Sequence, residues 1–394
     1  MLLLGDFRSL RPRHRSSQAE TLEWLANAHA RAEKLQATRE GREVDEVAFR
    51  ESMRRRLARF GCGDDKIASR GHELDDCSHQ RWGEMEVYRL EEGPSGEGMR
   101  VRTRAFGVIA QRALTQLFVE VETAPQHLLH VTCTGYEAPS AAQLLVASKQ
   151  WGRLTNVTHA YHMGCYAALP ALRIAAGFRS QARASAHIAG GQPRVDVVHT
   201  EICSLHLNPL RHDPEQLVIQ SLFADGCIAY SLFEEEAPRR GPALALLGQD
   251  EWIVPDSAAS MAWFCSDFGM EMTLARDVPQ KIAESLHPFV ETLLTRAGVS
   301  PSSASSALFA IHPGGPKIVD QVGAALGLEE PQIEHSRRVL KERGNMSSAT
   351  LPHVWKSIAE SSQVPEGQLV VSLAFGPGLT LSGAVLRKVA VPAC

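Results

Sequence analysis

The sequence predicts an α/β protein built from two similar lobes, each of which mixes strands and helices. From about residue 127 onward, apolar residues alternate with polar ones in several short runs, which is typical of strands in a half-buried sheet. Longer segments with helical spacing stand between these runs. The same succession of strand-like and helical segments resumes after a Pro/Gly-rich link at residues 237–242. We therefore expect two halves, residues 1–235 and 236–394, that form one inseparable core.

The length and composition are those of a globular protein of enzyme size. The chain has 394 residues, of which 44% are hydrophobic and 22% charged, and this balance excludes a disordered chain. Its net charge of −4 gives no general signal for nucleic acid or for an acidic membrane surface. No apolar run approaches the roughly 18 residues that span a bilayer, and the apolar start is too short for a secretory signal. We expect a cytoplasmic protein without a membrane span or a nucleic-acid partner.

Two helices are expected near the N-terminus. Ser17 and Glu20 have the spacing of a capping box, and apolar residues at helical spacing follow, so a helix is predicted over residues 17–36. A second helix is predicted over residues 46–60, with several arginines near its end. The polar, Gly-rich stretch at 62–98 predicts a loop with short elements.

The remaining elements are predicted from alternation, helical spacing and turn residues. In the first half we expect a strand at 127–133, a helix at 140–150, a strand at 158–163, a helix at 166–176 closed by Gly177, and strands near 194–203 and 227–233. In the second half we expect a strand near 243–253, a helix at 279–297, a strand at 306–312, helices at 316–326, 330–343 and 347–361, and strands around 368–375 and 380–389.

The eight cysteines are expected to be free thiols, because the chain is long and has no secretory signal. None of them forms a CxxC pair, so the sequence predicts no metal site. Cys165 differs from the others because a strand ends at Gly164 and an Ala/Leu-rich helix follows. The positive end of that helix would favour a thiolate. A buried cysteine in a tight junction is the alternative interpretation, at roughly even odds on the local pattern alone.

A thiolate nucleophile needs a proton partner and hydrogen-bond donors for an oxyanion. His312 ends an apolar strand before a helix that begins at Pro316, and Asn345 stands just before another helix. Each alone has an ordinary interpretation, since a lone histidine is more often structural and an asparagine often caps a helix. All three residues lie at the ends of strands or helices, where catalytic residues tend to lie, and the combination favours catalysis.

The order Cys165, His312, Asn345, followed by Gly376-Pro377-Gly378, resembles type III polyketide synthases, the chalcone-synthase-like branch of the thiolase fold. Residues 221–226 and 277–279 also look like that family, and the resemblance runs from about residue 17 to 391. The sequence around Cys165, together with Cys133-Thr134-Gly135-Tyr136, is more similar to bacterial alkylpyrone and alkylresorcinol synthases than to plant chalcone synthases.

The resemblance implies a layered αβαβα fold with two similar halves and an acyltransferase activity. Cys165 would carry an acyl group taken from an acyl-CoA starter, and His312 would keep Cys165 ionised. With Asn345, His312 would stabilise the enolate that forms when malonyl-CoA, or a similar extender, loses carbon dioxide. Repeated Claisen condensation and ring closure would give a pyrone or resorcinol. No cofactor or metal is implied.

The resemblance also assigns residues to the substrate cavity. Phe223 matches one of two gatekeeper phenylalanines, and Met272 stands at the second gatekeeper position, where its flexible thioether would reshape the cavity. The remaining cavity positions by this alignment are Cys133, Thr134, His206, Trp263, Ser347, Gly376, Pro377 and Gly378.

The basic cluster near the end of the second helix falls where the family binds CoA phosphates. A solvated basic helix face is the alternative for any single member. The assigned positions are Arg55, Arg56, Arg59 and Lys66. The family is homodimeric, so a homodimer is expected, with Ala138 at the position that would reach the partner's cavity.

Three other functions remain open from the sequence. A ketoacyl-ACP synthase III-like enzyme shares Cys-His-Asn but performs a single condensation. A cysteine hydrolase would release a free acid and CoA without malonyl-CoA. In a non-catalytic scaffold Cys165 would be inert. The starter, the number of extensions and the mode of ring closure depend on cavity volume, which side-chain identity alone does not fix.

Overall fold

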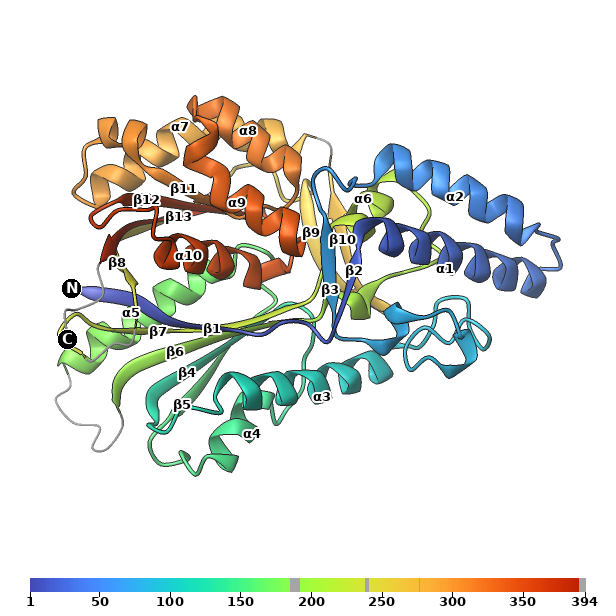
Figure 1. The fold of residues 1–394 in the computed structure, drawn as a ribbon, viewed down its shortest axis with the longest axis horizontal. Coiled ribbons are helices and arrows are strands. Elements are labelled where there is room, and N and C mark those ends of the chain that lie inside the picture. Colours follow the sequence, from blue (N-terminus) through green and yellow to red (C-terminus); the bar gives the residue numbers. More distant parts are fainter. Residues whose placement is uncertain (185–191, 238–240, 276, 390–394) are drawn as a thin grey trace.

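A computed structural model describes residues 1–184, 192–237, 241–275 and 277–389. Its secondary structure is arranged in layers, in which helices and β-sheet alternate across the molecule (Figure 1). The layering follows the αβαβα order expected from the sequence. Residues 238–240 of the expected link lie outside the described residues.

One continuous nine-stranded sheet runs through both halves in the order β11-β12-β13-β8-β1-β7-β6-β4-β5. β4 is parallel to β5 and β6, and β11 is parallel to β12, whereas the other pairs are antiparallel. The strands are β1 (Leu2–Ser9), β4 (Pro125–Thr132), β5 (Asn156–Tyr161), β6 (Gln192–Glu201), β7 (Gly226–Glu234), β8 (Ala243–Ile253), β11 (Leu308–Ile311), β12 (Leu369–Gly376) and β13 (Thr380–Val389). Two small antiparallel pairs are β2 (His14–Ser17) with β3 (Ser69–His72), and β9 (Met261–Ser266) with β10 (Gly269–Leu274).

The helices form the remaining layers. They are α1 (Gln18–Arg39), α2 (Glu46–Phe60), α3 (Met99–Leu117), α4 (Ala141–Ser148), α5 (Ala168–Ala184), α6 (Pro214–Leu222), α7 (Val278–Arg296), α8 (Pro316–Leu326), α9 (Glu330–Arg343) and α10 (Thr350–Glu360). Short 3₁₀ turns are η1 (Asp75–Ser78), η2 (Trp82–Glu84), η3 (Cys203–His206), η4 (Pro301–Ser306) and η5 (Ser347–Ala349).

The middle layer consists of α5 and α10, which lie between the β11–β13 part of the sheet and the part formed by β1, β7, β6 and β4 (Figure 1). α5 contacts β4, β6 and β7 as well as β13, and α10 contacts β1 and β7 as well as β11. Apolar residues of both helices and of strands from both halves form one buried cluster. Residues from both parts of the chain therefore contribute to this core.

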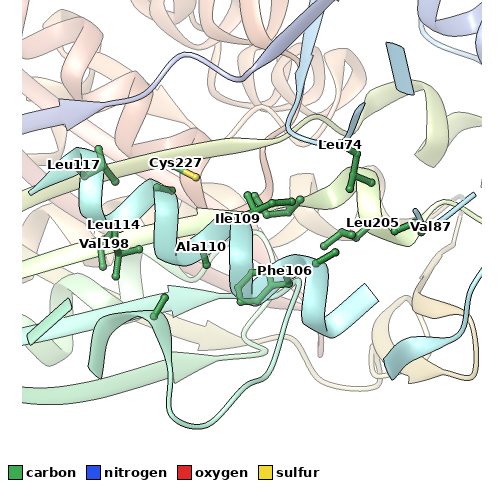
Figure 2. Close-up of a cluster of buried hydrophobic side chains, with 14 of the residues drawn as sticks. Leu74, Val87, Phe106, Ile109, Ala110, Leu114, Leu117, Val198, Leu205 and Cys227 are labelled. Atoms are coloured by element: carbon green, nitrogen blue, oxygen red, sulfur yellow. The ribbon is translucent and has the colours of Figure 1, made fainter. Parts of the chain in front are cut away.

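A second core lies on the other face of the N-terminal strands, under α3 (Figure 2). Phe106, Ile109 and Ala110 recur at helical spacing on one side of α3, and they are nearly or fully buried. Val198 of β6 and Cys227 of β7 belong to the same cluster. This packing holds the outer helix layer against the sheet.

Several elements begin where sequence signals place them. Ser17 caps α1 through a reciprocal capping box with Glu20, and the Asp45 carboxylate accepts hydrogen bonds from two backbone N–H groups at the start of α2. α2 has the predicted bounds, and α7 to α10 lie where the sequence places them, the last preceded by η5.

Two sequence expectations about the elements are wrong. Gly177 does not close the helix after Cys165, because α5 continues to Ala184. One glycine costs a helix only about 1 kcal/mol, and a side chain at Gly177 would meet nothing within 4 Å. Local sequence patterns also gave no indication of β1, β2, β9, β10, α3 or α6.

None of the helices in the described parts of the chain is both long and apolar enough to cross a membrane.

Candidate active site

Cys165 lies in the turn between β5 and the first residue of α5. Gly164 before it has φ +79°, and a Cβ there would lie 2.8 Å from Cδ of Pro377. Glycine is therefore required both for the backbone conformation and for the close approach of the turn that joins β12 and β13. Gly376 ends β12, and Pro377 and Gly378 lie in that turn, so the end of the strand and the turn contact the Cys165 junction.

Asn345 contacts the loop that follows His312. The amide of Asn345, which is 1% exposed, donates from Nδ2 to the carbonyl of Gly314 at 3.1 Å. Its Oδ1 accepts from the backbone N–H of Ser347 at 2.9 Å. His312 directly follows β11, is 2% exposed, and has neither ring nitrogen hydrogen-bonded to any described residue. Both nitrogens are therefore available to hydrogen-bond a substrate.

Cys165 is half-buried and faces the same group of residues. Its Sγ lies 3.9 Å from Oγ of Ser347. Burial raises the pKa of the Cys165 thiol to about 12, although hydrogen bonds from the Ser347 and Asn345 side chains act in the opposite direction. Burial also lowers the pKa of His312 to about 3. Desolvation therefore favours the thiol and the neutral imidazole, and it opposes the thiolate that the helix N-terminus would favour.

Four of the predicted cavity residues line one cavity. Phe223, Met272, His206 and Trp263 all contribute to its wall, and Trp263 stands opposite Met272 in the β9–β10 pair. Phe223 is joined to the catalytic candidates, because its backbone pairs with that of Asn345. Cys203, which the sequence analysis left without a role, also lines this cavity.

The other predicted cavity residues lie outside this wall, and Cys133, Ser347 and Pro377 lie beside the Cys165 junction. Sγ of Cys133 accepts from the N–H of Gly164 at 3.0 Å, and the Cys133 carbonyl accepts from Nε1 of Trp263 at 3.0 Å. The Thr134 carbonyl accepts from Nε2 of His206 at 2.7 Å. These bonds connect the cavity wall to the Cys165 junction.

Glu201 is a buried acid beside this junction that sequence reasoning missed. Its carboxylate accepts from the N–H of Cys133 at 3.0 Å, from Oγ1 of Thr134 at 2.9 Å and from Oγ of Ser348. Burial raises the pKa of Glu201 to about 7. An acidic residue at the end of the apolar run of β6 was the available signal, since a buried carboxylate requires such donors.

Some of the basic residues on and after α2 form strong contacts within the protein, whereas others are exposed to solvent. Arg54 is ion-paired with Glu23 and Glu51. Arg56 donates to the carbonyl of His212. Arg55 and Arg59 are exposed, with the Arg59 guanidinium 5.1 Å from the Phe60 ring centroid. Lys66 is exposed beside Asp65, with Nζ 3.6 Å from a carboxylate oxygen.

The described residues contain no group of three or more His, Cys, Asp or Glu side chains placed to hold a metal ion.

Comparison with known proteins identifies the family. The family described as "Chalcone and stilbene synthases, C-terminal domain" matches residues 246–390. "Probable polyketide synthase 1" of Dictyostelium discoideum is 32% identical over 266 residues, which are 67% of this chain, and the match spans 8% of that relative's length.

Solved structures match over the whole chain. The C-terminal type III polyketide synthase domain of Steely1, a type I/III hybrid from Dictyostelium, has a TM-score of 0.80 at 25% identity, with 99% of each chain covered. PKS-I of the brown alga Ectocarpus siliculosus has a TM-score of 0.80 at 21% identity, with 98% of each covered, and shows the same fold. The chain therefore belongs to the type III polyketide synthases, the chalcone- and stilbene-synthase family of acyl-transferring enzymes.

Proposed function

We propose that this chain catalyses iterative decarboxylative Claisen condensation of malonyl-CoA, or a similar extender, onto an acyl group held on Cys165. The observation that carries the proposal is the buried imidazole of His312, whose ring nitrogens have no hydrogen-bond partner among the described residues and which precedes by two positions Gly314, the acceptor of the Asn345 amide. The Asn345 side chain also hydrogen-bonds the Cys165 thiol. Such an arrangement supplies a proton acceptor for the thiol and donors for a developing oxyanion.

In the first step, the neutral imidazole of His312 accepts the thiol proton while the sulfur of Cys165 attacks the starter thioester. The departing CoA thiolate takes that proton, which leaves Cys165 acylated and His312 neutral. Nδ2 of Asn345 and an N–H of His312 then donate to the thioester oxygen of the extender. Loss of carbon dioxide leaves an enolate on that oxygen, and its carbon attacks the acyl group and releases the Cys165 thiolate.

The exposed cationic side chains near the end of α2 would bind the phosphate groups of CoA. Arg59 and Lys66 lie around the end of α2, which packs next to α6. The N–H of Cys62 donates to Oγ of Ser221 at 2.8 Å, and Ser221 lies two residues before the gatekeeper position Phe223. A CoA chain held by these cations would therefore enter beside Phe223.

We also propose that the protein is a homodimer in the cytoplasm. The loop at Glu137, Ala138 and Pro139 is exposed, which leaves it available to a second copy. The seven cysteines in the described residues are free, as expected for a reducing compartment. The bacterial alkylpyrone or alkylresorcinol type remains our proposal for the product class.

The test is incubation with a graded series of acyl-CoA starters and labelled malonyl-CoA, with products read by mass spectrometry. Several extensions that end in a pyrone or resorcinol are expected. Cys165→Ala should abolish product while its thermal melting stays cooperative, whereas Cys265→Ala, at an exposed position, should leave turnover near the wild-type value. A single β-keto product on a carrier protein, hydrolysis alone, or full turnover by Cys165→Ala would contradict the proposal.

A further inference from the structure

Several polar side chains that line the cavity are hydrogen-bonded to other described residues. Two nitrogen atoms, on two side chains of one strand, have no such partner. His206 is held at both ring nitrogens. Gln216 donates to the carbonyl of Met272 at 2.8 Å, and Gln220 donates to that of Asn208 at 3.1 Å. The exceptions are Nη2 of Arg70 and Nε2 of His72, both on β3.

Arg70 is a buried cation without a counter-ion. It is 4% exposed, and Nε donates to Oε1 of Gln18 at 2.9 Å while Nη1 donates to the carbonyls of Gln220 and Phe223, both at 2.8 Å. Nη2 has no hydrogen-bond partner, and no ion pair joins Arg70 to a carboxylate among the described residues. Burial lowers the pKa of Arg70 to about 10, so it remains charged at neutral pH. A buried charge without a partner raises the free energy of the folded protein, and a bound anion would lower that free energy again.

His72 presents a second free nitrogen from the same strand. It follows Arg70 by two positions, so the two side chains leave β3 on the same face. It is 5% exposed, and its Nε2 is buried without a partner. Burial, together with His14 and Arg70, lowers the pKa of His72 to about 4, which keeps it neutral at pH 7. A neutral imidazole can offer an N–H at Nε2.

We propose that Arg70 and His72 form a subsite for an anionic oxygen group on the acyl chain, either a carboxylate or the enolate of a β-diketone. This subsite rests on the proposed function, since that function places an acyl chain in the cavity. Two donors, one of them cationic, match the two oxygens of either group. An apolar chain end would leave both nitrogens unpaired, as they are in the empty cavity.

The first experiment measures binding without catalysis. In a Cys165→Ala background, hexanoyl-CoA and adipoyl-CoA, which differ only in a terminal carboxylate, are titrated by calorimetry. We expect adipoyl-CoA to bind about tenfold more tightly, the effect of one hydrogen bond to a charged group. His72→Leu and Arg70→Gln should each bring that ratio close to one. Leu25→Met, which changes an apolar part of the same wall, should keep it.

Thermal melting separates binding from a structural role. Leucine at position 72 removes an unsatisfied buried nitrogen, so His72→Leu should melt at or above the wild-type temperature while it loses selectivity. A lower melting temperature with unchanged selectivity would make His72 structural and overturn its part in the subsite. If Arg70→Gln fails to fold, because Arg70 also holds three backbone or side-chain oxygens, His72→Leu still decides the question.

The second experiment distinguishes the two sources of the anion. Wild-type and His72→Leu proteins receive hexanoyl-CoA and malonyl-CoA, and the number of extensions is counted by mass spectrometry. Fewer extensions in His72→Leu with this methyl-ended starter assign the subsite to the growing chain, and adipoyl selectivity in binding assigns it to the starter. Absence of both effects overturns the subsite. Adipoyl selectivity in a protein that makes no polyketide would overturn the proposed function alone.

Discussion

At the scale of single residues, the protonation states of Cys165 and His312 decide how the reaction can start. Burial raises the Cys165 pKa to about 12 and lowers the His312 pKa to about 3, so desolvation disfavours a preformed thiolate–imidazolium pair. The thiol must therefore lose its proton as the thioester arrives, when the developing oxyanion gains donors. Deprotonation of Cys165 and binding of the thioester substrate then occur together.

Alkylation of Cys165 by iodoacetamide tests this protonation state. A raised pKa leaves the sulfur as a thiol at neutral pH, so the rate at Cys165 should rise steadily from pH 7 to pH 10 without a plateau. Peptide mass spectrometry follows the label at this residue, with Cys165→Ala as the blank. A plateau already reached below pH 8 would show that the thiolate is present in the free protein.

Local sequence patterns indicated the three candidate residues of this site, but they did not indicate the surroundings of these residues. Cys165, His312 and Asn345 stand at the ends of elements, and local patterns predict such places. Glu201 and Arg70 were missed because their significance depends on burial by distant segments. Arg70, for example, is enclosed by Gln18, Gln220 and Phe223, and no local pattern records that contact.

At the scale of elements, the turn between β12 and β13 fits closely against the Cys165 junction. A Cβ at Gly376 would lie 2.1 Å from Cδ1 of Tyr166, and one at Gly164 would lie 2.8 Å from Cδ of Pro377. Neither contact leaves room for a side chain. The position of the nucleophile is therefore set by a hairpin from the other half of the chain.

Gly164→Ala tests this contact, with Gly298→Ala as the matched control. Both glycines have positive φ, +79° and +69°, so alanine adds a backbone cost of about 1–2 kcal/mol at each. Only Gly164 also meets another residue, since a Cβ at Gly298 would meet nothing within 4 Å. Overpacking should add about 1–3 kcal/mol to the Gly164→Ala destabilisation and lower turnover strongly. Equal urea-unfolding midpoints and equal turnover in the two variants would contradict this role.

Three of the elements that the sequence missed, α3, β9 and β10, share a physical cause. α1 and α2 begin with capping side chains, which sequence patterns reveal. α3 begins at Gly98 without a side-chain cap, and its fully buried Arg102 interrupts the apolar pattern. β9 and β10 pair only with each other, and partly exposed residues dominate them. Tertiary contacts stabilise these elements, so local sequence does not predict them.

At the scale of the whole molecule, one sheet joins the two halves through β1 and β8. Leu2, Leu3 and Leu4 of β1 pair with Leu246, Ala245 and Leu244 of β8. The sequence predicted two lobes with a shared core but not this pairing, because the apolar run at residues 2–4 is too short to indicate a strand by its pattern. A cooperative transition of the whole chain follows from this continuity.

This cooperative unit buries many histidines in the neutral form, and it should therefore be sensitive to acid. Burial lowers their folded pKa values to about 3 or 4, against 6.5 for an unperturbed histidine. The unfolded chain binds the protons first, so the stability that these groups contribute is present above pH 6.5 and lost below it. The group comprises His29, His72, His130, His199, His206, His312, His335 and His353.

Acid should therefore unfold the protein well above the pH at which exposed carboxylates titrate. Each buried histidine loses about 1 kcal/mol between pH 7 and 5.5, so the whole group loses an amount comparable to the roughly 5–15 kcal/mol stability of a typical domain. Glu201 and Asp225, whose pKa values burial raises to about 7, act in the opposite direction, but these two groups oppose eight histidines.

Urea unfolding followed by circular dichroism at half-unit steps of pH should show the midpoint falling steeply below pH 6.5. His130→Gln, away from the site, should flatten that fall, and a midpoint that is constant or rises down to pH 5.5 would contradict the argument.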